Sequence, residues 1–484
     1  MDLFGTAGIR GSAEDRVTPE LALAVGRAVA AEIRENGNEE TSAAEVVLAR
    51  DGRVTGPAIA AAMESGLASG GVQVLRAGQL PTPGLAHASQ GRYGVMLTAS
   101  HNPPADNGIK LFRDGSEFDR DAENAVEERV AGGEPTAAWD EWTTTERVDV
   151  LDSYLDDVVA YAERFGADLD GLRIAVDCGN GMAAPATPTV LRRLGAEVVT
   201  LNGNVDGHFP GRGSKPTPET LRNLRAFVAN ANEGVDRLGR SGGGNGGGEA
   251  DDTAGFAFGL GHDGDADRIV VVDADGDVVH EDTVLALLAE RYTRDSDADD
   301  PVVVTTPNAS GRIDERVHEA GGRVERVRLG ALHEGIAAVR ADASGDTDVV
   351  FAAEPWKHIH VAFGEWIDGV ASAAVIARLV ADVGLDALRE PITERPYRKR
   401  SVDCPDGAKL EVMDRLETTL PDAFPDATVD TEHGVRLEFP DASWALVRPS
   451  GTEPYVRVYA ESDDVDELVE SVTAVVGVAV TESA

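Results

Sequence analysis

The chain has 484 residues, of which 86 are acidic and 44 are lysine or arginine, so its formal net charge is −42. This excess of carboxylates argues against nucleic acid or an anionic membrane as a partner, because the phosphate groups of both would repel it. It favours adaptation to high salt, since the Debye length falls to roughly 3 Å at about 1 M salt and the self-repulsion is screened.

The first block of the chain alternates strands with helices, a pattern typical of parallel βαβ units. Thr18 is predicted to cap a helix whose first residue is Pro19, since both residue types are favoured at those positions. The predicted strands are "AEVVLAR" (44–50), "GVQVLRAG" (71–78) and "YGVMLTA" (93–99), and a second helix is predicted at "PAIAAAMESGLAS" (57–69).

The same alternation recurs twice further along the chain. The second block has predicted strands at "LRIAVDCGNG" (172–181), "AEVVTLNG" (196–203) and "AGFAFGLGHDGDADR" (254–268), with a helix at "PATPTVLRRLG" (185–195). The third block has predicted strands within 301–312, 322–330 and 348–358. Three α/β blocks of similar pattern therefore follow one another.

The last block is different and predicts a small α+β unit. A helix is predicted at "KLEVMDRLETTL" (409–420), and strands at "GVRLEFP", "SWALVRP" and "YVRVYAE". The sequence thus predicts an α/β protein with three similar mixed α/β domains and a small C-terminal α+β domain. The predicted domain boundaries are 1–147, 148–277, 278–395 and 396–484.

A glycine-rich stretch from Gly239 to Asp252 is predicted to be a flexible surface insertion in the second domain. It contains G-x-G-x-x-G, but no strand leads into it and no helix leaves it. It is therefore not a dinucleotide-binding motif.

Cys178 and Cys404 are the only cysteines, too few for a disulfide framework or a thiolate zinc cluster. The N-terminus lacks the charged and apolar regions of a signal peptide. The longest apolar stretch near the C-terminus, "VTAVVGVAV", is too short to cross a bilayer. We therefore expect a soluble, cytoplasmic protein.

Polar loops follow predicted strands, and in open α/β sheets ligands bind beyond the carboxyl ends of strands. The first such loop holds Ser100 and His101. A hydrolase dyad is not favoured, because adjacent side chains seldom adopt nucleophile–base geometry and the G-x-S-x-G elbow is absent. A serine that accepts and donates a phosphoryl group remains, with Lys110 and His101 as its cation and acid/base; a plain turn serine is the alternative.

The second loop, "HDGDADR", contains alternating acidic residues. Asp263, Asp265 and Asp267 could converge on one hard cation, and Arg268 follows them directly. The spacing does not fit an EF-hand, because Arg268 and Ala274 occupy the positions of its glycine and glutamate. Three carboxylates beside an arginine predict a Mg²⁺ site that faces a phosphate, with a solvated acidic turn as the alternative.

Two further loops predict ligand contacts. "EPWKH" places Glu354, Trp356, Lys357 and His358 where they could bind or stack on a polar ring, although an aromatic that covers a strand end explains them equally well. "RPSGTEPYVR" combines arginines, hydroxyls and loop N–H groups into a compact anion site. Its residues are Arg448, Ser450, Gly451, Thr452 and Arg457. A reactive serine, a cation site, a polar-ring site and a phosphate clamp suit phosphoryl transfer on a phosphorylated sugar.

These motifs resemble those of the α-D-phosphohexomutases, in family order and over essentially the whole chain. "TASHNPP" looks like the family's phosphoserine loop, "DGDADR" its magnesium loop and "RPSGTEP" its phosphate-binding loop; "FGTAGIRG" resembles its N-terminal motif and "EPWKH" stands where its sugar-specificity loop stands. The resemblance implies four domains around one central cleft.

The resemblance also implies a mechanism. Ser100 would carry a phosphoryl group, and one Mg²⁺ per active site would be held by the phosphoserine and the three aspartates. Donation to the sugar phosphate would give a bisphosphate, which also serves as activator, and its other phosphate would return to Ser100. Arg10, His101 and Lys110 match family positions near the transferring group. The "RPSGTEP" residues match the clamp on the phosphate that does not react.

One departure concerns the sugar. The common specificity loop reads G-E-x-S-G-H, but here Trp356 replaces the serine and Lys357 replaces the glycine, while Glu354 and His358 match. Trp356 would shrink the pocket or offer a stacking face, and the loop is closer to an archaeal branch. A hexose phosphate, such as that of glucosamine, mannose or glucose, is the leading prediction, and a pentose phosphate is the alternative.

Two other classes of function remain open from the sequence. In a sugar phosphatase, water would take the phosphate from Ser100, and the second phosphate clamp would then have less purpose. A non-catalytic sugar-phosphate binder would have no need of Ser100 and the aspartate triad together. The sequence does not decide between a monomer and a homo-oligomer.

Overall fold

The computed structural model describes residues 3–5, 8–36, 45–241, 255–343, 345–450 and 454–483, with the backbone alone for 235–241. The chain forms two compact units. The first contains residues 1–281 and 356–388, and the second contains residues 282–355 and 389–484. Most of the predicted insertion at 239–252 lies outside the described residues, and its first three residues continue a helix.

The first unit contains a seven-stranded mixed sheet in the order β1-β5-β4-β2-β3-β7, with β6 paired to β5. β2 pairs in parallel with β3 and β4, and β3 with β7, whereas β5 is antiparallel to β4, β1 and β6. The strands are β1 Ile9–Ser12, β2 Glu45–Arg50, β3 Gln73–Gln79, β4 Tyr93–Leu97, β5 Asp106–Arg113, β6 Ser116–Glu117 and β7 Thr145–Arg147.

The predicted parallel order therefore holds for β2, β3 and β4, but not for the whole block, since β5 returns antiparallel. The helices of this block are α1 Pro19–Asn36, α2 Gly56–Ser69, α3 Thr82–Ala88 and α4 Arg120–Gly132, with a short 3₁₀ turn η1 at Trp139–Glu141. α1 begins at the predicted residue, where the Leu21 amide donates to Thr18 Oγ1 at 3.3 Å.

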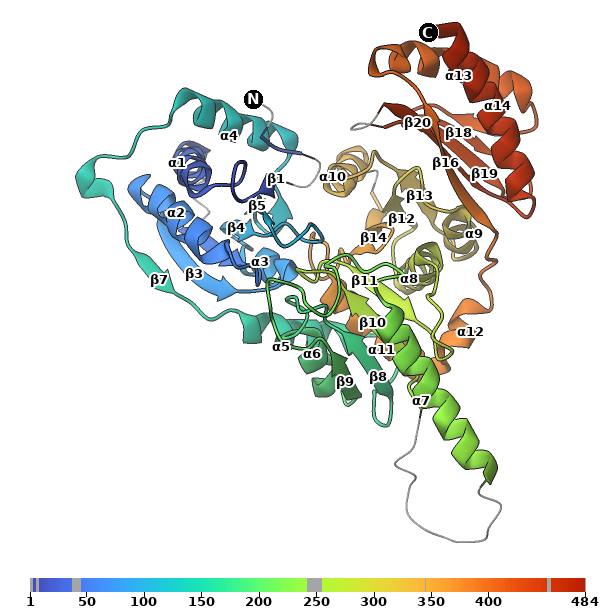
Figure 1. Cartoon of the computed structure of the whole chain (residues 1–484), viewed down its shortest axis with the longest axis horizontal. Coiled ribbons are helices and arrows are strands. Elements are labelled where there is room, and N and C mark those ends of the chain that lie inside the picture. Colours follow the sequence, from blue (N-terminus) through green and yellow to red (C-terminus); the bar gives the residue numbers. More distant parts are fainter. Residues whose placement is uncertain are drawn as a thin grey trace. The chain divides into compact units, whose positions relative to one another are not determined.

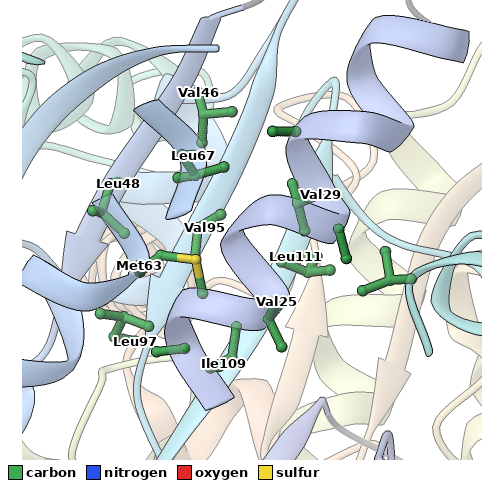
Figure 2. Packing of buried hydrophobic residues seen from close by; sticks show 14 of the residues in the cluster. Val25, Val29, Val46, Leu48, Met63, Leu67, Val95, Leu97, Ile109 and Leu111 are labelled. Carbon is green, nitrogen blue, oxygen red and sulfur yellow. The ribbon is translucent and has the colours of Figure 1, made fainter. Parts of the chain in front are cut away.

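The core of this block lies between the sheet and the pair α1 and α2 (Figure 1). Figure 2 shows Val25 and Val29 of α1 and Met63 of α2 directed at strand residues such as Val95. The two helices approach closely at glycines, because a Cβ on Gly66 would lie 2.4 Å from the Leu23 carbonyl oxygen.

The first unit also contains a four-stranded sheet in the order β11-β10-β8-β9. β8 is parallel to β9 and β10, and β11 returns antiparallel to β10. Its elements are α5 Leu151–Ala162, β8 Arg173–Asp177, α6 Thr187–Arg193, β9 Glu197–Leu201, α7 Arg222–Ser241, β10 Phe258–His262 and β11 Ile269–Val272. The later segment of the unit adds β15 Lys357–Ile359 and α11 Gly369–Val383, followed by α12 Leu385–Arg389.

The second unit contains three parallel strands, β13-β12-β14, and a five-stranded antiparallel sheet, β16-β20-β19-β18-β17. The first group comprises α8 Glu281–Asp295, β12 Asp300–Thr305, α9 Gly311–Glu319, β13 Arg323–Arg326, α10 Leu332–Asp342 and β14 Thr347–Glu354. The second comprises β16 Tyr397–Asp403, η2 Asp406–Ala408, α13 Lys409–Ala423, β17 Thr428–Asp430, β18 Val435–Glu438, β19 Trp444–Pro449, β20 Tyr455–Glu461 and α14 Val465–Ser483.

α13 and α14 lie side by side and pack with the antiparallel sheet on one apolar core (red in Figure 1). Three mixed α/β sheets and one antiparallel C-terminal sheet confirm the predicted fold class. Among the described residues, no helix has both the length and the apolar character needed to cross a membrane.

Candidate active site

Ser100 lies three residues beyond β4 in a buried turn. Its φ of 50° is in the left-handed region, which non-glycine residues adopt rarely and mostly at special sites. The Ser100 amide donates to Thr98 Oγ1 at 2.8 Å, and the Thr98 hydroxyl donates to Asp51 Oδ2 at 2.8 Å. The serine is thus held by its backbone, and its hydroxyl remains available for chemistry.

Arg53 holds the same turn from the other side, and the sequence analysis missed it. Its Nη2 donates to the Ser100 carbonyl oxygen at 2.9 Å and to that of Asn102 at 2.8 Å, while Nε donates to Asp51 Oδ2 at 3.0 Å. Arg53 and Asp51 are both fully buried. Burial raises the pKa of Asp51 to about 6, although the Arg53 guanidinium opposes the rise. The charged pair in "DGR" directly after a predicted strand was the signal that could have revealed this clamp.

The acidic loop between β10 and β11 meets the serine turn. Ser100 Oγ donates to Asp263 Oδ2 at 2.7 Å. The loops are so close that a Cβ on Gly264 would lie 2.6 Å from the Ser100 carbonyl oxygen, which explains the glycine there. Thr82, at the start of α3, donates from Oγ1 to Asp265 Oδ2 at 2.6 Å. The structure therefore joins the first two predicted motifs into one site.

The carboxylates of Asp263, Asp265 and Asp267 fit a divalent cation. Each offers an oxygen, and these oxygens lie within 4.8 Å of one another in a buried position. Asp265 Oδ1 and Asp267 Oδ1 are buried and accept no hydrogen bond from the described residues. Burial and the two neighbouring carboxylates raise the pKa of Asp263 well above its usual value. A bound cation would satisfy these oxygens and remove the repulsion.

Cationic side chains surround the same carboxylates. Lys110 Nζ lies 3.3 Å from Asp267 Oδ2 and 3.1 Å from Glu117 Oε1. Burial opposes the charge on Lys110, but the neighbouring carboxylates raise its pKa overall, so the ammonium is charged at neutral pH. Arg268 Nε lies 3.7 Å from Asp263 Oδ2. The site thus balances its buried negative charge with fixed positive groups.

The His101 ring lies beside Ser100, with Nδ1 3.4 Å from Ser100 Oγ. Adjacent side chains therefore do approach here, because the left-handed turn brings them to the same side, although the contact is long for a hydrogen bond. Burial, followed by the charges of Arg268 and Arg10, lowers the pKa of His101 to about 3. The imidazole is neutral at pH 7. Arg10, on β1, is close enough to act on both His101 and Lys110.

The predicted sugar loop begins in the second unit and continues in the first. Glu354, at the end of β14, accepts a hydrogen bond from the Gly330 amide. Trp356 has a φ of 68°, and its side chain packs on the apolar cluster around Leu224 and Val228 of α7. The side chain is half-buried, so it covers part of the second sheet, and its contact with a ligand stays a prediction.

The rest of the sugar loop joins the acidic loop. Lys357 forms a backbone bridge with Arg268, and its charge helps to lower the pKa of Asp267. His358 is buried, and its Nδ1 lies 3.0 Å from Ser372 Oγ. The same hydroxyl lies 2.8 Å from His360 Nε2 and donates to the Asp368 carbonyl oxygen at 2.7 Å. The Ser372 hydroxyl proton is used in the hydrogen bond to the Asp368 carbonyl oxygen, so Ser372 Oγ can only accept from the two histidine rings. Nδ1 of His358 is therefore the donor nitrogen of its ring, and Nε2 is the acceptor nitrogen.

The predicted phosphate clamp lies in the second unit. Arg448 of β19 and Arg457 of β20 are directly paired across the sheet. Arg448 Nη2 donates to Tyr459 Oη at 3.2 Å, and the Ser450 amide donates to the Tyr455 carbonyl oxygen at 3.0 Å. Gly451 and Thr452 lie outside the described residues.

Lys409 adds a cation to the clamp that the sequence analysis missed. Its Nζ donates to the Ser450 carbonyl oxygen at 2.6 Å, although Lys409 is 41 residues away in the chain. The same Nζ forms an ion pair with Asp406 Oδ1 at 2.6 Å, so the charge that this loop offers to an anion comes chiefly from the two arginines.

Comparison with known proteins finds three family matches, all described as phosphoglucomutase/phosphomannomutase: domain I over residues 1–136, domain II over 152–276 and the C-terminal domain over 402–477. A phosphopentomutase of Thermococcus kodakarensis is 39% identical over 96% of this chain and 94% of its own. A probable phosphoglucosamine mutase of Methanopyrus kandleri is also 39% identical, over 95% and 94%.

The solved structures give the same result. A phosphoglucomutase/phosphomannomutase family protein from Burkholderia thailandensis superimposes with a TM-score of 0.81 and is 26% identical, over 99% of this chain and 97% of its own. The likeness therefore extends over nearly the whole chain.

Proposed function

The chain belongs to the phosphoglucomutase/phosphomannomutase family and is a phosphosugar mutase, and we propose that it interconverts hexose 1-phosphate and hexose 6-phosphate through Ser100. The observation that carries the proposal is the hydrogen bond of 2.7 Å from Ser100 Oγ to Asp263 Oδ2. It places the buried hydroxyl of Ser100, in a strained turn, against a cluster of carboxylates that fits a divalent cation.

In this mechanism Ser100 carries a phosphoryl group when the substrate binds. The bond from phosphorus to Ser100 Oγ breaks as a hydroxyl oxygen of the sugar phosphate bonds to phosphorus, and the product is a sugar bisphosphate. The other phosphate of that bisphosphate then returns to Ser100, which leaves the isomer. Free bisphosphate would also restore the phosphoserine, so it acts as activator.

Asp263, Asp265 and Asp267 would hold one Mg²⁺ together with the phosphoserine. The ion would supply charge neutralisation to the transferring phosphoryl group. Arg268 and Lys110 lie at the same carboxylates and add fixed positive charge that needs no reorganisation during transfer.

Proton transfer is assigned to His101 and Lys110. The hydroxyl that attacks must lose its proton, and the neutral His101 ring beside Ser100 Oγ can accept it. The charged Lys110 can return a proton to Ser100 Oγ when that oxygen leaves phosphorus. Arg10 is assigned to the transferring phosphate, because its charge acts on both groups.

The clamp in the second unit is proposed to hold the phosphate that does not react. Arg448 and Arg457 offer guanidinium forks, and Ser450 offers a hydroxyl. Gly451 and Thr452 would complete the loop. This assignment favours a mutase over a phosphatase, because only a mutase must hold a second phosphate while the first is transferred. We also propose that the chain has the four domains predicted from the sequence, with boundaries at 1–147, 148–277, 278–395 and 396–484.

We keep a hexose as the leading candidate sugar, because Glu354 and His358 match the common specificity loop of the family. Glu354 and His358 are proposed to bind sugar hydroxyls, and the acceptor Nε2 of His358 would accept a hydrogen bond from one of them. Arg268 and Lys357 would add cations near the ring. The relative from Methanopyrus kandleri carries the corresponding name, probable phosphoglucosamine mutase.

Ribose 1-phosphate is the second candidate substrate. It is favoured by the relative from Thermococcus kodakarensis, named a phosphopentomutase, whose identity to this chain is the same 39%. The reaction would be the same, with ribose 5-phosphate as the product.

A turnover panel read by ³¹P NMR tests these proposals. The protein with Mg²⁺, high KCl and a trace of the matching bisphosphate is supplied with the 1-phosphates of glucosamine, glucose, mannose and ribose. We expect conversion of a hexose 1-phosphate to its 6-phosphate. Conversion of ribose 1-phosphate alone would establish the second candidate, and release of inorganic phosphate would establish a phosphatase.

Ser100→Ala is the matched control for the mechanism. It removes one oxygen and should abolish turnover without changing the circular dichroism spectrum. A folded Ser100→Ala variant that keeps wild-type turnover would contradict the assignment of Ser100, and loss of all four conversions in the wild type would favour a sugar-phosphate binder.

A further inference from the structure

A cavity of about 430 Å³ lies in the first unit between α2 and the sheet strands β2, β3 and β7. Each of the three strands contributes an arginine: Arg50, Arg76 and Arg147. None of the residues that line the cavity is acidic. This is unusual in a chain with 86 acidic residues against 44 basic ones.

A second cavity, in the second unit, allows the charges that line the two cavities to be compared. A cavity of about 590 Å³ there is also lined by three arginines, but five carboxylate side chains line it too. Arg323 and Arg328 at its wall form ion pairs with Asp300 and Glu334. The charges of that cavity are balanced by the chain itself.

Strand register places the three arginines of the first cavity on one face of the sheet. Arg76 pairs directly with Arg147 of β7 and with Leu48 of β2. Arg50 follows Leu48 by two residues and so points to the same face. Like charges directly opposite each other destabilise a sheet, so an anion between them would be stabilising.

Two of these arginines form no ion pair among the described residues, although the Asp51 carboxylate acts on Arg50 from a greater distance. Arg76 is ion-paired with Glu64 of α2, which does not line the cavity. Among the described residues, no ion pair joins Arg50 or Arg147 to a carboxylate; Arg50 Nη1 donates only to the Asp51 carbonyl oxygen, at 3.0 Å. Burial lowers the pKa of Arg50, which shows that its charge is partly withdrawn from water.

We propose that this cavity binds the phosphate group of a small molecule, either inorganic phosphate or a phosphomonoester, between Arg50, Arg76 and Arg147. Guanidinium forks bind phosphate oxygens in pairs, which gives both strength and orientation. Pro57, Ala60 and Ala61 of α2 form a wall of short side chains and leave room for the rest of the ligand. The volume lies within the range of small-molecule pockets, about 300–1,000 Å³.

This site is separate from the one at Ser100 but is connected to it through Asp51. Arg50 holds the Asp51 carbonyl oxygen, and the Asp51 carboxylate accepts the Thr98 hydroxyl that positions the Ser100 amide. A ligand on Arg50 would therefore act next to Asp51 and three residues before Arg53, the two side chains that hold the serine turn. The cavity is suited to an effector that shares the phosphate chemistry of the substrate.

The test is arginine modification by phenylglyoxal, read residue by residue by mass spectrometry, with rising concentrations of inorganic phosphate in a fixed KCl background. In the wild type we expect phosphate to protect Arg50 and Arg147 with the same half-saturation. Protection of neither residue would overturn the proposal, whatever happens at the substrate site, because each arginine is followed separately.

Two variants make the test specific. Arg147→Gln alters an exposed side chain and leaves the fold intact. It should raise the phosphate concentration that half-protects Arg50 about tenfold, the loss expected for one charge-assisted interaction. Arg222→Gln removes the same charge from an exposed position on α7 and should leave protection of Arg50 unchanged. Equal protection in Arg147→Gln and the wild type would overturn the site.

A second arm identifies the source of the phosphate. Glucosamine 6-phosphate and ribose 5-phosphate replace inorganic phosphate in the same assay. Protection at lower concentrations than inorganic phosphate would assign the cavity to a phosphomonoester, and protection at equal or higher concentrations would assign it to inorganic phosphate. Failure of the turnover panel would not affect this result, since protection is measured without turnover.

Discussion

The guanidinium of Arg53 donates to the carbonyl oxygen of Ser100 at 2.9 Å, and both residues are fully buried. The same side chain donates to the carbonyl oxygens of Asn102, Pro103 and Asp106. One arginine thus binds four backbone carbonyl oxygens in and just beyond the serine turn.

We therefore expect Arg53→Lys to damage catalysis as well as stability. Lysine keeps the charge but cannot reach four carbonyl oxygens from one planar group. The loss should destabilise the protein by about 3 kcal/mol and lower kcat at least tenfold. Thermal unfolding and steady-state kinetics at a temperature where the variant is folded would measure both effects.

Arg312→Lys is the matched control for this prediction. Arg312 is equally buried and pairs with Glu461 at 3.0 Å in the second unit, and it makes no hydrogen bond to the serine turn among those found for the described residues. It should lose a similar amount of stability and keep its kcat. If both folded variants had the same kcat as the wild type, the role given to Arg53 would be wrong.

Asp265→Asn should weaken the binding of Mg²⁺ without disturbing the loop. Asparagine keeps an oxygen that can accept the Thr82 hydroxyl, but one of the three carboxylate charges is lost. Calorimetry should show an affinity for Mg²⁺ at least tenfold lower, and the Mg²⁺ needed for half-maximal turnover should rise in parallel.

Asp275→Asn is a suitable control, because Asp275 is an exposed acidic residue near the loop and lies outside the triad. It should bind Mg²⁺ as the wild type does. Equal Mg²⁺ affinity in all three proteins would refute the metal assignment.

Ser372→Ala should affect sugar binding through His358. The Ser372 hydroxyl accepts hydrogen bonds from both His358 and His360, so its loss leaves two buried ring donors without that acceptor. We expect KM for the sugar phosphate to rise several-fold with a smaller change in kcat, and stability to fall by about 2 kcal/mol.

Ser372→Thr keeps the hydroxyl and serves as the rescue variant. A role for Ser372 in positioning predicts that KM returns toward the wild-type value in this variant. A role limited to stability predicts a lower unfolding temperature in Ser372→Ala with KM unchanged.

Low salt should destabilise the protein because of its net charge of −42. Dilution from about 1 M to about 0.01 M salt lengthens the Debye length from roughly 3 Å to roughly 30 Å, so the carboxylates repel one another over much of the molecule. We expect the unfolding temperature to fall as KCl is removed. Glycerol in place of salt is the control, and an unfolding temperature that is independent of KCl would exclude the predicted salt adaptation.

The sequence could predict those parts of the site whose residue types by themselves indicate a reaction or a bound ion. Ser100 and the aspartates stand directly after strands of clear apolar pattern, so their place at a sheet edge followed from β4 and β10. That the two loops touch could not be predicted, because the contact between Ser100 and Asp263 spans 163 residues.

The residues that hold the acidic loop and the phosphate clamp in place could not be predicted for a related reason. Thr82 and Lys409 act on partners 183 and 41 residues away, and nothing in their neighbouring sequence distinguishes them from surface residues. For Trp356 the sequence left two roles open, stacking on a ligand and covering a strand end, and its half-buried ring packs on the second sheet. β5 was not predicted either, although the absence of a helix between it and β4 is a signal for antiparallel pairing that the sequence does contain.

The complete burial of Ser100 has a consequence for control of the enzyme in the cell. A protein kinase or phosphatase must seat its target residue in its own active site, and the turn held by Arg53 and Asp263 would have to unfold before Ser100 could enter one. Phosphate exchange with a small sugar bisphosphate needs no such docking of a second protein. The fraction of enzyme that is charged with phosphate would then be set by metabolite levels, and signalling cascades would have no direct access to it.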